Sequence, residues 1–118
     1  MDWKQAIAQH AKWKEEFCSA FAKQHAMDAD TIAQDNCCEV GKWLHGEAKS
    51  RLGRLASYSE CITEHAAFHV EAAKVARAIN SKRYAEAEAM LCAGAPYATA
   101  SASVAAAIVH LKQEADLP

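Results

Sequence analysis

The sequence has few helix-breaking residues. It contains only 4 glycines and 2 prolines among 118 residues, while hydrophobic residues make up 52% and charged residues 24%. This composition excludes collagen-like and disordered chains and is typical of a packed globular protein. At this length we expect a single domain over residues 1–118, because two domains would each lie near the lower size limit for a stable core.

Long hydrophobic runs and an excess of one charge are also missing. The longest apolar stretch, Val104 to Leu111, contains His110 and is far shorter than the roughly 20 residues of a membrane-spanning helix. No apolar segment near Met1 resembles a secretory signal, so we expect a cytoplasmic protein without a membrane span. The formal net charge is −2, and basic residues are scattered among acidic ones. Because nucleic acid binding needs a basic surface, we do not expect nucleic acid as a partner.

Cysteine occurs in an odd number, which argues against a disulfide framework. The five positions are Cys18, Cys37, Cys38, Cys61 and Cys92. In a reducing compartment, such thiols more often bind metal or carry out redox chemistry. The cysteines are therefore candidates for a functional site.

Alanine, the strongest helix former, accounts for 28 of the 118 residues and favours an all-α fold. A loop or single short turn is expected between the first two of the predicted helices, and Asp35 or Asn36 would cap the second. Apolar residues at intervals of three or four predict helices at residues 2–26, capped by Asp2; 37–46; 57–80, begun by a capping box of Ser57 and Glu60; 84–92; and from Pro96 onward.

These amphipathic helices fit an antiparallel four-helix bundle with additional short helices better than any fold that contains a sheet. The last helix is rich in alanine and serine between Ala98 and Ala107. Small side chains let another backbone approach closely, so this face could contact a second copy of the chain in a homodimer.

Two histidines lie one helical turn apart in the sequence His65-Ala66-Ala67-Phe68-His69. At this spacing both imidazoles can reach one metal ion from the same helix face. The pair alone is weak evidence, because buried histidines that are hydrogen-bonded to their neighbours are common.

A more specific pattern is Cys38-Glu39-Val40-Gly41-Lys42-Trp43. A cysteine in the first turn of a helix has its thiolate stabilised by unpaired amides and the helix dipole, and the thiolate is the form that binds metal. Gly41 would permit close backbone packing, and Trp43 would shield the site from water. Cys38, rather than Cys37, has the helical phase of both residues.

A third histidine, His10, lies on the inward face of the first predicted helix, where an imidazole without a partner would cost free energy. It could complete a set of three imidazoles and one thiolate with Cys38, His65 and His69. Such a set suits tetrahedral Zn²⁺ between the helices. We therefore predict a zinc site formed by these residues.

The arrangement resembles the chemoreceptor zinc-binding domain family, abbreviated CZB. The resemblance rests on His10 followed by Trp13, on Cys-x-x-Gly-x-Trp, and on His-x-x-x-His after 21 further residues, 44–64. It implies a cytoplasmic, dimerising four-helix bundle in which His10, Cys38, His65 and His69 bind zinc. Members usually belong to bacterial chemoreceptors or diguanylate cyclases and respond to zinc or to oxidants such as hypochlorous acid, so this function is expected here.

An enzyme is not expected. Catalytic zinc usually keeps an open position and a general base, whereas four ligands close the site and Ala66 stands where a zincin has its glutamate. A di-iron bundle would need inward carboxylates that the helix patterns lack. A metal-free helical interaction module remains the main alternative to a sensor.

Other cysteines and histidines stand apart from this set. Cys61 lies one turn before His65 and could replace Cys38 as a ligand or act as a resolving thiol. Otherwise Cys61, Cys18 and Cys92 are expected to be small apolar core residues. Three histidines belong to no spaced set and are expected at the surface or at helix ends: His25, His45 and His110.

Overall fold

In the computed structural model, which describes residues 3–92 and 94–116, the chain folds as helices alone. The helices are α1 (Trp3–Lys23), α2 (Ala29–Ile32), α3 (Glu39–His45), α4 (Glu47–Leu52), α5 (Ala56–Asn80), α6 (Tyr84–Met90) and α7 (Pro96–Ala115). Three of them are long, and the others are one or two turns. The predicted all-α class is confirmed.

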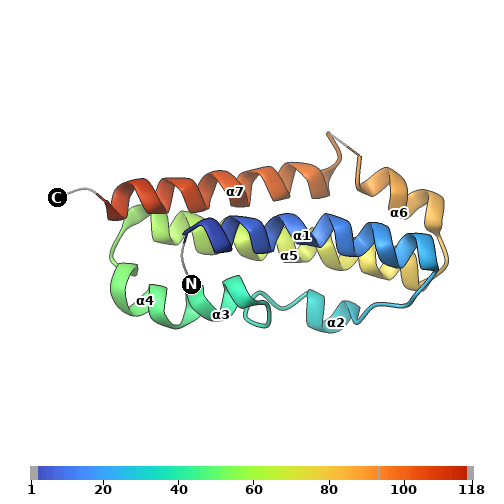
Figure 1. The fold of residues 1–118 in the computed structure, drawn as a ribbon, viewed down its shortest axis with the longest axis horizontal. Coiled ribbons are helices and arrows are strands. Elements are labelled where there is room, and N and C mark those ends of the chain that lie inside the picture. The colour runs from blue at the N-terminus through green and yellow to red at the C-terminus, as the bar shows by residue number, and fades with distance from the viewer. Residues whose placement is uncertain (1–2, 93, 117–118) are drawn as a thin grey trace.

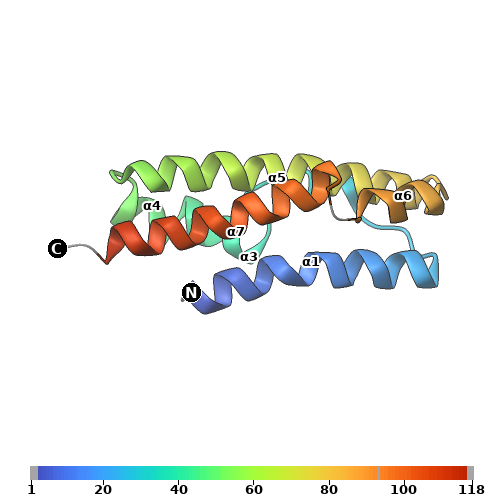
Figure 2. The ribbon, with the colours of Figure 1, turned by 90° about the horizontal axis from the view of Figure 1, so that it is seen from above.

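The long axes run nearly parallel in an elongated bundle of 50 × 25 × 20 Å. In Figure 1, α1 and α5 run in one direction, while α7 and the succession α2, α3, α4 return in the other. This is the expected antiparallel four-helix arrangement, with one of its four members broken into three short helices. Figure 2 shows α7 lying along α5, and α1 on the far side of α7 from α5 in that view.

The core lies around α5, which has twelve buried residues along 25 positions. An aromatic group joins the three long helices: the ring of Tyr97 in α7 lies 5.6 Å from that of Phe17 in α1 and 5.4 Å from that of Phe68 in α5. Val104, Ile108 and Leu111 are fully buried on α7. Within the described residues, no helix is both long and apolar enough to cross a membrane.

The predicted capping box at the start of α5 is wrong. The helix begins at Ala56, and the backbone amide and hydroxyl of Ser57 both donate to one carboxylate oxygen of Glu114, at 3.1 and 2.9 Å. Glu60 instead lies beside His110, at 3.3 Å. A residue 57 positions away in sequence thus supplies the cap.

Other predicted helix ends also need correction. Helix α1 ends at Lys23, three residues early, because Gln24 adopts a left-handed φ of 56°. Helix α3 is capped by Cys38 and not by Asp35 or Asn36. Asp2, the predicted cap of α1, lies outside the described residues, whereas Pro96 does open α7.

Candidate metal site

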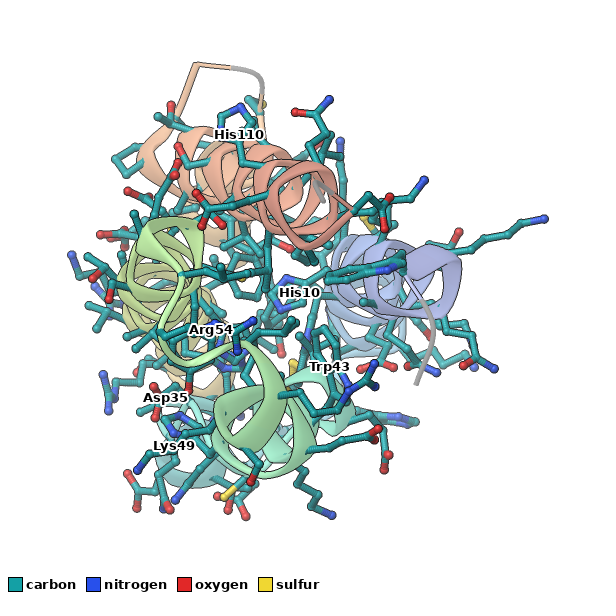
Figure 3. All side chains as sticks on the ribbon, turned by 90° about the vertical axis from the view of Figure 1, so that its left-hand side faces the viewer. His10, Asp35, Trp43, Lys49, Arg54 and His110 are labelled. Atoms are coloured by element: carbon teal, nitrogen blue, oxygen red, sulfur yellow. The ribbon has the colours of Figure 1, made fainter. Side chains whose placement is uncertain are left out.

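Four side chains from three parts of the bundle meet in its centre. His10 lies in α1, Cys38 immediately precedes α3, and His65 and His69 lie in α5. Each offers one possible ligand atom, and these four atoms lie within 4.8 Å of one another. Figure 3 looks along the bundle and shows His10 pointing into the space that the helices enclose. The structure thus brings together all four residues that the sequence singled out.

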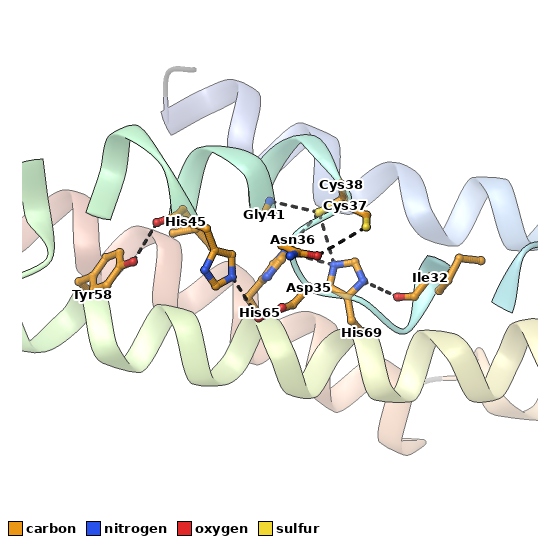
Figure 4. Close-up of polar contacts among 11 residues, drawn as sticks. Ile32, Asp35, Asn36, Cys37, Cys38, Gly41, His45, Tyr58, His65 and His69 are labelled. Atoms are coloured by element: carbon orange, nitrogen blue, oxygen red, sulfur yellow. Dashed lines mark hydrogen bonds and ion pairs between the residues drawn. The ribbon is translucent and has the colours of Figure 1, made fainter. Parts of the chain in front are cut away.

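The α5 pair forms the base of this group. The Nε2 atoms of His65 and His69 are 3.2 Å apart, and the Cys38 Sγ lies 3.4 Å from each of them, as Figure 4 shows. Because Cys38 Sγ and the two Nε2 atoms are in mutual contact, there is room for few hydrogens between them. The geometry therefore concentrates lone pairs at a single point.

The orientation of His69 is fixed by a backbone group. Its Nδ1–H donates to the carbonyl of Ile32 at 2.8 Å, in the last residue of α2. Because a carbonyl only accepts, the hydrogen lies on Nδ1 and the Nε2 lone pair faces Cys38 and His65. Hydrogen bonds of this kind orient metal-binding histidines, and no side-chain pattern in the sequence could have revealed this one.

His10 has no hydrogen-bond partner at all within the described residues. Only 4% of it is exposed, yet both ring nitrogens are unpaired, as is Nδ1 of the fully buried His65. The ring of His10 lies 4.5 Å from that of Phe68 and 4.9 Å from that of His65. A buried polar group left unpaired costs about 1–3 kcal/mol. A cation held by one ring nitrogen of His10 would give that nitrogen a partner and reduce the cost, so the residues present fit a metal ion.

Cys38 also caps α3. Its backbone is extended, with φ −81° and ψ 164°, and its Sγ accepts the amide hydrogen of Gly41 at 3.2 Å. A Cβ on Gly41 would collide with the carbonyl oxygen of Asp35, so only glycine fits against the chain that leads into Cys38. The Cys-x-x-Gly spacing thus places the sulfur at the helix start and in the site together.

Burial determines the protonation of the site. It lowers the pKa of His10 to about 3, with the charge of His69 adding to the effect, and it lowers the pKa of His65 to about 2, aided by His10 and His69. The pKa of His69 is also lowered by burial, against the opposing hydrogen bond to Ile32. Near neutral pH these imidazoles are neutral, the form that binds metal.

Burial has the opposite consequence for the thiol of Cys38. It raises the pKa above the usual 9.0, although the amide of Gly41 acts in the other direction. In the metal-free protein the sulfur is therefore mostly protonated at neutral pH. Metal binding at Cys38 must release that proton.

The predicted shielding of the site by Trp43 is not observed. Trp43 packs edge-on against Trp3, with ring centroids 5.4 Å apart. Trp13 is the indole beside the site, 5.9 Å from the ring of His69 and stacked on Phe17. Its position three residues after His10, on the same helix face, was the signal that identifies it.

The remaining cysteines lie outside the group of four. Cys61 is fully buried, and burial raises the pKa of its thiol to about 12. Its predicted role as a core residue agrees with this burial, whereas Cys18 and Cys92 are exposed and do not belong to the core. Cys37 is half-buried, and its sulfur contacts the side-chain oxygens of Gln34 and Asn36 at 3.4 and 3.5 Å.

The remaining histidines lie at the surface, as predicted. His45 pairs with Asp35 at 3.2 Å and His110 with Glu60 at 3.3 Å, while His25 is exposed. The group of four contains no carboxylate. Neither a zincin general base nor the bridging carboxylates of a di-iron site is therefore present among its members.

Comparisons with known proteins agree with this geometry. The family model described as the chemoreceptor zinc-binding domain matches residues 10–76. The match starts at His10 and covers all four residues of the group. No curated protein and no solved structure matches the chain.

Proposed function

Because the chain belongs to the chemoreceptor zinc-binding domain family, we propose that it binds one zinc ion and regulates a bacterial signalling protein. The observation that carries the proposal is the convergence of four possible ligand atoms within 4.8 Å, one of them on a buried imidazole without any partner. The proposed ligands are His10, Cys38, His65 and His69.

The donor set favours zinc over other ions. Three neutral imidazoles and one thiolate match the nitrogen and sulfur ligands of closed tetrahedral zinc sites, whereas calcium and magnesium prefer oxygen. When bound, zinc supplies a charge that holds the thiolate and imidazoles in one place. Because all four positions are taken by protein atoms, we propose a regulatory role and not a catalytic one.

The ligands would connect α1, the residue that precedes α3, and α5. Helix α3 has only seven residues, and its start depends on the bond from the Gly41 amide to Cys38. Short elements of this kind open more easily than a long core helix such as α5. The position of α3 is therefore the property that we expect to change when the ligand set is complete or broken.

Two stimuli can disrupt the proposed four-ligand zinc site. One is low zinc availability. The other is oxidation of Cys38, in which the thiolate and hypochlorous acid give a sulfenic acid and chloride. A sulfenic acid accepts the Gly41 amide less well than a thiolate does, so the cap of α3 weakens and residues 36–46 are free to move.

The expected partners are a second copy of the chain and a cytoplasmic chemoreceptor or diguanylate cyclase. Part of the small-residue face of α7 is exposed, including Ala102, Ala106 and Val109, the last with 38% of its surface accessible. This supports a homodimer through α7. We propose residues 1–118 as one such domain.

Metal analysis of the purified protein tests the proposal. Native mass spectrometry should find one zinc per chain. Substituting Cys38→Ala or His69→Ala should weaken zinc binding by about 100-fold or more, since structural sites bind with roughly 10–16 kcal/mol spread over four ligands.

Cys61→Ala and His45→Ala serve as matched controls outside the group and should keep the zinc. A protein that takes up no metal would leave the metal-free interaction module as the better reading. Two irons per chain would indicate a di-iron site.

A further inference from the structure

Two cavities border Cys38. The larger, of about 240 Å³, lies between α1 and α3, and the smaller, of about 70 Å³, lies on the α2 side. Cys37 and Trp13 line both of them, so these residues stand between the two openings. His10 forms part of the wall of the larger cavity and His69 part of the smaller.

The larger cavity carries two carboxylates. Glu16 projects from α1, two turns after Gln9, and Glu39 is the first residue of α3. Within the described residues neither carboxylate has an ion-pair or hydrogen-bond partner, and no lysine or arginine lines this cavity. Both acidic groups are exposed and thus reachable from solvent.

The same cavity leads to the unpaired histidine. His10 lies in its wall, 96% buried, with no partner for either ring nitrogen in the described part of the chain. The sulfur-bearing Cys38 borders it as well. Carboxylates at the exposed side and nitrogen and sulfur donors at the buried side give a path of increasingly soft ligands.

Size distinguishes the two cavities. A divalent cation with four to six waters occupies on the order of 120–180 Å³, at roughly 30 Å³ per water. The larger cavity offers more than three times the space of the smaller for such an ion. The smaller cavity is also lined by no charged side chain, only by residues such as Thr31, Ile32 and Gln34.

We propose that the cavity between α1 and α3 is the route by which a hydrated divalent cation reaches the site. Glu16 and Glu39 attract the ion, and His10 and Cys38 then replace its water. This inference rests on the proposed zinc-binding function. Neither carboxylate belongs to the final ligand set, because neither lies in the group of four.

The experiment measures how fast Co²⁺ or Zn²⁺ binds to the metal-free protein by stopped flow. Co²⁺ is followed through its thiolate absorption band, and Zn²⁺ through the fraction of sites that Co²⁺ fails to fill when both ions are mixed with the metal-free protein at once. The variant is Glu16→Gln/Glu39→Gln, and the matched control is Glu15→Gln/Glu88→Gln, which removes the same two charges from exposed positions on α1 and α6.

At about 10 mM salt, where the Debye length is roughly 30 Å, the variant should bind Co²⁺ about three- to tenfold more slowly than wild type. The difference should shrink at about 150 mM salt. The control should bind at nearly the wild-type rate, and all proteins should show the same cobalt spectrum once loaded.

Equal association rates for variant and wild type would overturn the inference, as would an equal slowing in the control, which would indicate net charge alone. A changed cobalt spectrum in the variant would also overturn it, by making a carboxylate a ligand. Wild-type protein that binds neither ion would instead contradict the proposed function.

Discussion

Among the residues that the structure describes, His10 has the most buried polar side-chain atoms without a hydrogen-bond partner. Its ring is buried against Phe68 and His65 with both nitrogens unpaired in the described part of the chain. A hydrophobic side chain would be better for stability alone, since burying an unpaired polar group is unfavourable. The histidine is therefore explained by a ligand and not by packing.

The metal-free protein should lose stability as the pH falls below about 6.5. Burial lowers the pKa of His10 to about 3 and of His65 to about 2, so the unfolded chain takes up protons that the folded chain refuses. Stability is full above pH 6.5 and is lost progressively down to about pH 3. At pH 5, each of these histidines should cost about 2 kcal/mol. Urea unfolding from pH 4 to 8 in a chelator measures this.

A His10→Phe variant is the matched control for that measurement. It should recover about 2 kcal/mol at pH 5 and show a shallower dependence on pH, because one titrating group is gone. It should also bind zinc poorly. An unchanged slope in the variant, or a wild type as stable at pH 5 as at pH 7, would show that these imidazoles are not held neutral.

Among the elements, α3 best shows how the site and the local fold depend on each other. Cys38 is both the N-cap of α3 and a member of the metal group, and Gly41 allows the preceding chain to pass close by. The sequence predicted a helix here but assigned its cap to Asp35 or Asn36, because those side chains are common caps. Cysteine rarely has that role, so propensity pointed to its neighbours.

The boundaries of α5 show the same limit. Its periodicity predicted the helix and its end at Asn80 correctly, because the inward positions repeat over seven turns. Its start was misread, because the true partner of the Ser57 amide is Glu114 on another helix. A cap supplied across the bundle leaves no local pattern.

Substituting Gly41→Ala should destabilise the protein although alanine is the better helix former. The new methyl group would meet the backbone of Asp35 and Asn36, and relieving that contact requires α3 to shift. We expect a loss of about 1–3 kcal/mol in urea unfolding and weaker zinc binding.

Ser50→Ala, an exposed change to alanine in α4, should leave stability unchanged or raise it by a few tenths of a kcal/mol. A Gly41→Ala protein as stable as wild type would mean that the contact between α3 and residues 35–36 is not needed.

Across the whole molecule, the group of four lies in the interior of a bundle 50 Å long and draws on α1, on the chain before α3 and on α5. Residues 28, 27 and 4 positions apart in sequence meet there. Only the last interval, between His65 and His69, is fixed by helix geometry. The other two depend on how the helices pack, so the sequence could suggest them only through the inward position of His10, the place of Cys38 at a helix start, and resemblance to a family.

Zinc K-edge X-ray absorption of the zinc-loaded protein tests the central claim most directly. The account predicts four ligands, one sulfur at about 2.3 Å and three nitrogens at about 2.0–2.1 Å, with the sulfur shell lost in Cys38→Ala. A zinc shell without sulfur, or one dominated by carboxylate and water oxygen, would contradict it.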